Sequence, residues 1–156
     1  MLTALLLLVC LGAGLIGGVF FAFSTFVMKA LAQLPASQGI AVMQRINTVV
    51  LNPVFLGIFV GTAVLSVLCV SASFFPWGTT RSLLLLVTGL SYVIGSFGVT
   101  VAFNVPRNER LAKLASESTE TLAYWPVYVG EWLFWNHVRT PASLASTASA
   151  AGALVS

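Results

Sequence analysis

The chain has 156 residues, of which 58% are hydrophobic and 7% are charged, and its formal net charge is +3. A soluble domain has about 25% charged residues. The composition therefore excludes a water-soluble globular protein and indicates an integral membrane protein whose main partner is the lipid bilayer. One histidine, two cysteines and four acidic residues argue against a metal site, because such sites draw on several of these ligands. No basic arm suggests nucleic acid as a partner.

The first apolar run covers residues 2–28 and predicts a membrane helix. No basic segment precedes this run, and it is too long for the hydrophobic core of a signal peptide, so we expect it to be retained. Gly14 and Gly18 have the spacing that lets two membrane helices approach closely, and Gly57 and Gly61 repeat it. Packing within the chain is the simpler explanation of both pairs, and a homodimer is the alternative.

Residues 30–51 are of mixed polarity, with apolar positions at helical spacing. This pattern predicts a short amphipathic helix that lies at the membrane interface or folds onto the bundle. Asn52 and Pro53 have the residue types of a helix cap and a first helical turn. They predict that a second membrane helix begins here and covers residues of about 53–75.

A third membrane helix is predicted at about residues 81–103, where the apolar run is long enough to span the bilayer. We expect residues 104–106, Asn-Val-Pro, to break it, because proline disfavours a helical conformation in the residue before it. Residues 107–114 predict a charged amphipathic turn or two of helix. The polar residues 116–121 predict a loop.

The chain ends in an Ala- and Ser-rich segment, residues 141–156. As a helix this segment would rise only about 23 Å, which is short of the hydrocarbon core of roughly 30 Å. A fourth span therefore requires a helix that begins upstream, and we expect it at about residues 132–156. The predicted fold class is all-α: a four-helix transmembrane bundle with short amphipathic interfacial helices, in a single domain.

The basic residues predict the orientation of this bundle. All but Arg81 lie in the first and third connections: Lys29, Arg45, Arg107, Arg110, Lys113 and Arg139. By the positive-inside rule these connections are cytoplasmic and both termini lie outside. A plasma membrane of bacterial type fits this pattern.

The need to sit in lipid does not by itself explain the composition of one stretch, residues 125–140, WPVYVGEWLFWNHVRT. On a helix, its large rings share an arc of roughly 100° with one amide and one guanidinium; these residues are Trp125, Tyr128, Trp132, Trp135, Asn136 and Arg139. His137 would lie nearly opposite this arc and Glu131 on its flank. An interfacial aromatic belt with a snorkelling arginine is one explanation, but a belt does not call for an asparagine in the same arc.

The predicted topology also brings other asparagines to the membrane face where this stretch begins. They are Asn47, Asn52, Asn104 and Asn108, of which Asn52 is explained as a helix cap. Polar groups that converge at one end of an apolar bundle are typical of a small-molecule site between helices.

The motif FNVPRNERLA at residues 103–112 and the later W-x2-Y-x3-W-x2-WNHVRT resemble the DUF1772 family, which includes the fungal anthrone oxygenases. GGVFFAFSTFVMKAL in the first helix and MQRINTVVLNPVF are also similar to that family, so the resemblance covers essentially residues 10–145. It implies a small four-helix membrane protein. For some members it implies oxidation of an anthrone to an anthraquinone with molecular oxygen and no established cofactor.

That activity would need a flat apolar slot, a base, and donors at the developing oxyanion. Tyr128, Trp132 and Trp135 would form the slot. Arg139 and Asn136 would stabilise the oxyanion, and Asn104 and Asn108 would add donors.

The base is less well defined by the sequence. His137 has a suitable side chain but lies away from the slot, and a structural role is its alternative. Glu131 is the second candidate, and an ion pair with a basic residue is its alternative.

The sequence thus leaves two main functions open. The first is an oxygenase acting on a small hydrophobic aromatic ligand, and the second is a non-catalytic membrane scaffold or binding protein. A transporter is a weaker third option, because four spans allow little alternating access. If Arg139 and Asn136 share a pocket with Asn104 or Asn108, a small-molecule site is favoured. If the aromatic rings point at lipid instead, an interfacial aromatic belt is favoured.

Overall fold

The computed structural model describes residues 1–75 and 77–156, and this part of the chain is helical with no strand. Short connections divide it into five continuous helical stretches. In chain order their segments are α1 (Leu2–Ala22), η1 (Phe23–Val27) and α2 (Met28–Gln33); α3 (Ala36–Val49); α4 (Pro53–Ser73); α5 (Thr80–Leu90), η2 (Ser91–Gly98), η3 (Thr100–Asn104) and α6 (Val105–Ala112); and α7 (Thr119–Val155). The segments labelled η have the wider turn of a π-helix.

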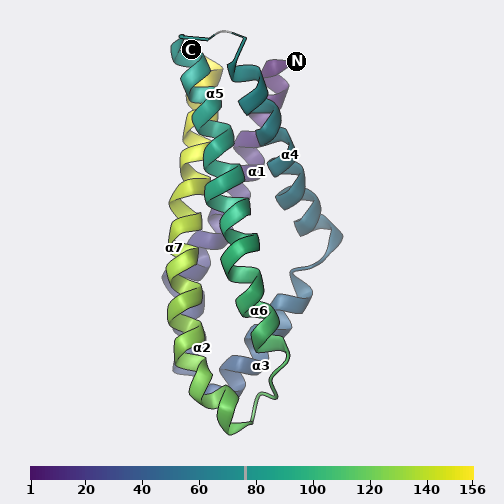
Figure 1. Ribbon diagram of the computed structural model, residues 1–156, viewed down its shortest axis with the longest axis vertical. Coiled ribbons are helices and arrows are strands. Elements are labelled where there is room, and N and C mark those ends of the chain that lie inside the picture. The colour runs from purple at the N-terminus through teal and green to yellow at the C-terminus, as the bar shows by residue number, and fades with distance from the viewer. Residues whose placement is uncertain (76) are drawn as a thin grey trace.

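Three of these stretches are long and apolar enough to cross a membrane: Leu2–Gln33, Pro53–Ser73 and Thr80–Ala112. The prediction of an all-helical membrane protein is confirmed at this level. The longest helix, α7, has 37 residues and packs most extensively against α1. Both chain termini lie at the same end of the bundle, and α3 and α6 lie at the other (Figure 1).

The expected break of the third helix at residues 104–106 was wrong. The helix continues through Asn104 into α6 and ends at Ala112. The change from the π-helical turn of η3 to the α-helical turn of α6 occurs at this point and puts Pro106 in the first turn of α6. A first-turn residue needs no intrahelical partner for its nitrogen, so proline is tolerated there.

The last helix begins well before residue 132. Its first residue is Thr119, and the hydroxyl of Ser118 caps it by accepting from the Thr121 backbone N–H at 3.2 Å. Half of the polar segment 116–121 that we expected to be a loop is therefore helical. Pro126 and Pro141 both lie inside α7.

The short helix α3 folds onto the end of the bundle opposite the termini, where it packs against α2, α6 and α7. Its Ile40 and Met43 are buried in a cluster with Leu111 and Trp132. The Gln44 amide fixes the helix further, because Nε2 donates to the carbonyls of Leu111 and Leu114 at 2.8 and 2.9 Å. This contact covers the C-terminal end of α6, whose last carbonyls have no intrahelical partner.

Candidate functional site

The centre of the polar end is Arg139 of α7, whose side chain is buried with 3% exposed. One terminal nitrogen donates to Asn136 Oδ1 at 2.6 Å and the other to Thr100 Oγ1 at 3.2 Å. The guanidinium carbon lies 4.1 Å from the Phe20 ring centroid and 5.0 Å from that of Trp132. Arg139 Nε has no hydrogen-bond partner, and no carboxylate in the described part of the chain forms an ion pair with it. A buried cation of this kind is costly, so it marks a candidate site.

Asn136 holds Arg139 in position. Its Nδ2 donates to the Phe20 carbonyl and to Ser24 Oγ, both at 2.7 Å, which leaves Oδ1 turned to the guanidinium. Ser24 Oγ in turn lies 3.1 Å from Thr140 Oγ1. These bonds join α7 to the first helix at the point where α1 changes into η1, and side-chain groups that insert beside helix carbonyls commonly accompany such irregular turns.

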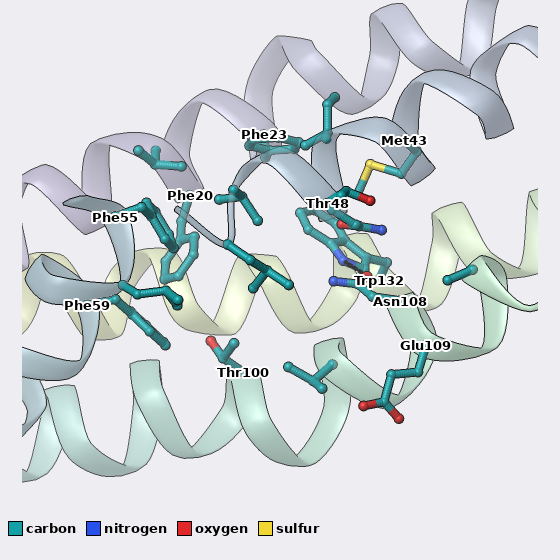
Figure 2. A pocket seen from close by; sticks show the side chains of 18 of the residues that line it. Phe20, Phe23, Met43, Thr48, Phe55, Phe59, Thr100, Asn108, Glu109 and Trp132 are labelled. Carbon is teal, nitrogen blue, oxygen red and sulfur yellow. Dashed lines mark hydrogen bonds between the residues drawn. The ribbon is translucent and has the colours of Figure 1, made fainter. Parts of the chain in front are cut away.

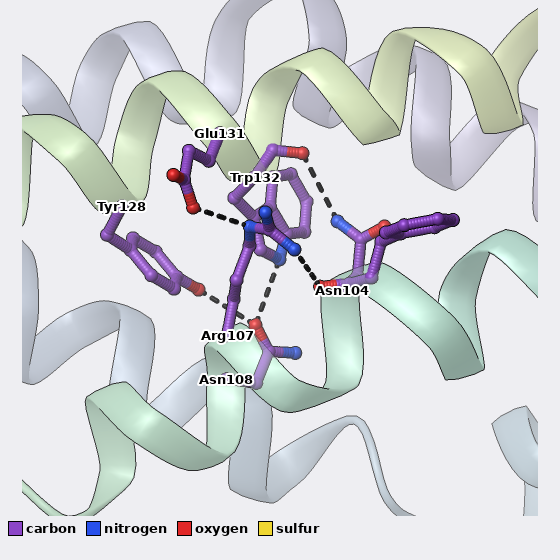
Figure 3. A network of polar contacts seen from close by, with 7 residues as sticks. Asn104, Arg107, Asn108, Tyr128, Glu131 and Trp132 are labelled. Atoms are coloured by element: carbon purple, nitrogen blue, oxygen red, sulfur yellow. Dashed lines mark hydrogen bonds and ion pairs between the residues drawn. The ribbon is translucent and has the colours of Figure 1, made fainter.

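Two asparagines of the third helix bind the other side of the aromatic stretch (Figure 3). Asn108 Oδ1 accepts hydrogen bonds from Tyr128 Oη and from Trp132 Nε1, both at 2.9 Å. Asn104 is buried, and its Nδ2 donates to the Trp132 carbonyl at 3.2 Å, while its Oδ1 has no partner in the described part of the chain. These contacts fix the plane of the Trp132 ring, which also packs against Phe23 at a centroid distance of 5.4 Å.

A cavity of about 400 Å³ lies between α3, the start of α4, the segment η3–α6, and the facing parts of the first helix and α7. Its volume is within the range of roughly 300–1,000 Å³ typical of ligand sites. The rings of Phe20, Phe55 and Phe59 gather at one end, and Trp132 and Asn108 lie at the other (Figure 2). The polar residues on its wall are Gln44, Asn47, Thr48, Thr100, Asn108, Glu109 and Arg139.

The structure brings together some of the predicted site residues. Arg139, Asn108 and Trp132 line the cavity. Asn136, Tyr128 and Asn104 are buried behind this wall and contact it through the hydrogen bonds described above. The buried face of the stretch therefore does not behave as a lipid-facing belt.

The other three predicted residues lie outside the cavity. The half-buried Trp135 stacks on Phe103, with ring centroids 3.5 Å apart and planes at 6°. Glu131 is 48% exposed and pairs with Arg107 at 2.8 Å, which is the alternative role we gave it. His137 is exposed. Asn52 is a helix cap as expected, since its Oδ1 accepts from the Phe55 backbone N–H at 3.0 Å.

Several lining residues were not among those predicted from the sequence. Gln44 and Thr48 come from α3, and their place on the wall depends on how α3 folds back. Thr100 lies one turn before Asn104, a spacing that could have indicated a shared face. Glu109 lies in the charged motif at residues 107–114, where a solvated surface was the simpler interpretation.

A family model described as "Anthrone oxygenase" matches residues 51–149 of the chain. The matched region is more than half of the chain and contains α4, the whole third helix and most of α7. It therefore includes the buried Arg139, both asparagines that bind the aromatic stretch, and the Pro106 turn. No match to the chain was found among curated proteins or among solved structures.

Proposed function

The chain belongs to the anthrone oxygenase family, and from this premise we propose that it is a membrane enzyme that oxidises an anthrone-like aromatic compound to the quinone with molecular oxygen. The observation that carries the proposal is Arg139, a buried guanidinium on the wall of an aromatic cavity, whose Nε has no acceptor and which has no acidic partner among the described residues. An anion formed inside the cavity would supply the missing negative charge.

The reaction balances without a further reductant. Anthrone, C₁₄H₁₀O, and O₂ give anthraquinone, C₁₄H₈O₂, and H₂O. A base removes a proton from the CH₂ group between the two rings, and the resulting carbanion is delocalised onto the carbonyl oxygen. The carbanion reduces O₂ and forms a carbon–oxygen bond, and the resulting peroxide anion takes the proton back from the base to give a hydroperoxide at that carbon. Loss of the remaining hydrogen from the same carbon and cleavage of the oxygen–oxygen bond release water and leave the second carbonyl.

In this reaction Arg139 would donate to the oxygen that gains negative charge. Such a donor is worth about 2.7–4 kcal/mol of barrier in a dry site. Asn136 is a positioning residue, because it contacts the guanidinium and lies behind the cavity wall. Trp132, held flat by Asn108, and the rings of Phe20 and Phe55 offer faces for a planar substrate.

For the base we assign Glu109, an exposed carboxylate at the edge of the cavity. Figure 2 shows it on the α6 side of the cavity, near the Asn108 and Trp132 end. Neither Glu131, which is engaged with Arg107, nor His137 lines the cavity, so each would have to move to reach a ligand there. A carboxylate positioned against a CH₂ proton typically contributes about 10²–10⁴ in rate.

The proposed topology has four crossings, with α7 as the fourth. With 37 residues, α7 is about 55 Å long and exceeds the core of roughly 30 Å. Its buried Asn136, Ser143 and Ser146 lower its hydropathy, but they face the bundle. An even number of crossings also agrees with termini at one end of the bundle (Figure 1).

We further propose a plasma membrane location with the basic connections in the cytoplasm and both termini outside. Gly57 and Gly61 meet no other part of the described chain within 4 Å, so this face of α4 is free to pack against a second copy.

The experiment is oxygen uptake by the purified protein in lipid nanodiscs with anthrone as substrate. We expect one O₂ consumed per quinone formed, with quinone followed by its absorbance. Arg139→Gln should lower the rate by about 10²–10³. Arg107→Gln is the matched control, since it removes an arginine whose ion pair lies at the surface, and it should retain the rate. Anthrone binding without oxygen uptake by the wild-type protein would favour a non-catalytic binder.

A further inference from the structure

The cavity communicates with the outside through the side of the bundle. Leu51, Val101 and Val105 all line the cavity, yet their side chains are 65%, 53% and 37% exposed. A side chain that lines the cavity and is also exposed lies where the cavity opens to the outside. We call these three residues the side opening.

The side opening exists because α4 and the third helix separate toward this end. The helix α4 packs closely against α5 and η2 but makes no comparable contact with η3 or α6 in the described part of the chain. The two helices diverge in Figure 1 as α4 approaches its N-terminal end. Leu51 precedes α4 on one side of the gap, and Val101 and Val105 belong to the third helix on the other.

The depth of the side opening follows from helix lengths. With 21 residues, α4 is about 31 Å long and matches the hydrocarbon core of roughly 30 Å, so Pro53 marks the core boundary. Phe59 contacts Phe97 with ring centroids 5.2 Å apart. Since α4 and the third helix are antiparallel, Val101 lies near the level of Phe55, inside the core. Glu109, two turns beyond Val101, lies at headgroup level.

We infer that the ligand enters and leaves this cavity sideways from the bilayer, through the side opening. The occupant is a planar aromatic molecule with hydroxyl or carbonyl groups on its edge, a ligand class that rests on the proposed function. Such a molecule dissolves in lipid near the boundary, with its rings in the core and its polar edge at the headgroups. The apolar side opening accepts the rings, while Glu109 and Thr48 at the boundary accept the polar edge.

The test uses two matched double variants on the same helix, reconstituted in vesicles with anthraquinone as an unreactive ligand. Val101→Phe with Val105→Phe narrows the side opening. Val87→Phe with Ile94→Phe also introduces two phenylalanine rings, at exposed positions outside the cavity wall. Stopped-flow quenching of tryptophan fluorescence measures association and dissociation. We expect the first variant to slow both by about tenfold and to change the affinity by less than about twofold, and the second to change neither.

The path is tested separately by varying the lipid at a fixed amount of ligand. For a route through the bilayer, the association rate follows the ligand-to-lipid ratio. A rate that follows the aqueous concentration, or a narrowed variant with wild-type kinetics, would overturn the inference. Lost affinity rather than slowed exchange would also overturn it, because the valines would then belong to the binding wall.

These outcomes are distinguishable from failure of the proposed function. Slowed exchange in the narrowed variant with no oxygen uptake by the wild-type protein keeps the lateral route and removes the oxygenase. Oxygen uptake by the wild-type protein with unchanged exchange in the narrowed variant keeps the oxygenase and removes the lateral route. If the wild-type protein does not bind anthraquinone, both proposals are overturned.

Discussion

The two ends of the bundle are built from the same long helices but differ in what separates those helices. At the end that holds the termini, the core consists of small and aliphatic residues such as Leu6, Cys69, Ala150 and Ala153. At the other end, aromatic rings lie between the helices, the first and third helices contain the π-helical segments η1 and η3, and a cavity of about 400 Å³ remains. Close packing holds the first end together, while the second end carries the buried cation and the candidate site.

The largest difference between the ends should be seen in catalysis. Glu109→Gln removes the proposed base from the cavity wall, so we expect the rate of oxygen uptake with anthrone to fall by about 10² or more. The matched control is Glu117→Gln in the exposed connection before α7, which should retain the rate. Glu131→Gln tests the other carboxylate: a loss confined to that variant would transfer the base to Glu131.

Gly89 tests the close packing of the terminal end. A methyl group there would collide with the Ser66 carbonyl and the Val70 side chain. We therefore expect Gly89→Ala to lower the free energy of unfolding by about 1–3 kcal/mol, measured by reversible unfolding in detergent. Gly130→Ala, where the added methyl group meets no described atom within 4 Å, is the control. Equal stability of the two variants would contradict the contrast in packing.

Asn108 tests the polar end by its hydrogen bonds. Asn108→Leu leaves the Tyr128 hydroxyl and the Trp132 N–H without their acceptor. The free energy of unfolding should then fall by about 1–3 kcal/mol. The fluorescence spectrum should also change, because the environment of Trp132 changes. Asn108→Asp keeps an acceptor oxygen and should restore the spectrum. If both variants behave alike, the acceptor is not what holds the ring.

The smallest effect is expected at the surface of the polar end. Arg107→Gln breaks the ion pair with Glu131, whose two side chains are 22% and 48% exposed. Exposed pairs of this kind contribute about 0–1 kcal/mol, so a small change in thermal unfolding is expected, smaller still at high salt. A large loss of stability would mean that the bond from Arg107 to the Phe103 carbonyl at 2.8 Å matters more than the ion pair.

The sequence carried enough information for the parts of the site that lie on one helix. Helical spacing alone brought Trp132, Asn136 and Arg139 to one face, and that face is buried. Residue types identified the Asn52 cap, and composition identified the membrane. These features depend on local helix geometry and on the preference of each residue type for water or lipid, and both can be read from a single sequence.

The parts that depend on contacts between helices were not predictable in the same way. The partners of Asn136 and Arg139, the Phe20 carbonyl and the Thr100 hydroxyl, follow from how the helices pack. Pro106 was expected to end a helix because the expectation assumed α-helical turns, and a π-helical segment precedes it instead. Glu109 was passed over because charged neighbours are usually solvated; its side chain is indeed exposed, and its place beside the cavity depends on how the helices pack around it.

The length of α7 has a chemical consequence. In the proposed topology of four crossings, a helix of about 55 Å in a core of roughly 30 Å extends into the aqueous phase, and the proposed reaction lies where it leaves the core. An oily substrate and O₂ both dissolve in the hydrocarbon phase, whereas the water produced, which carries both hydrogens of the substrate's CH₂ group, belongs to the aqueous phase. The protein would then catalyse the reaction at a phase boundary, taking both reactants from the hydrocarbon phase and releasing water into the aqueous phase.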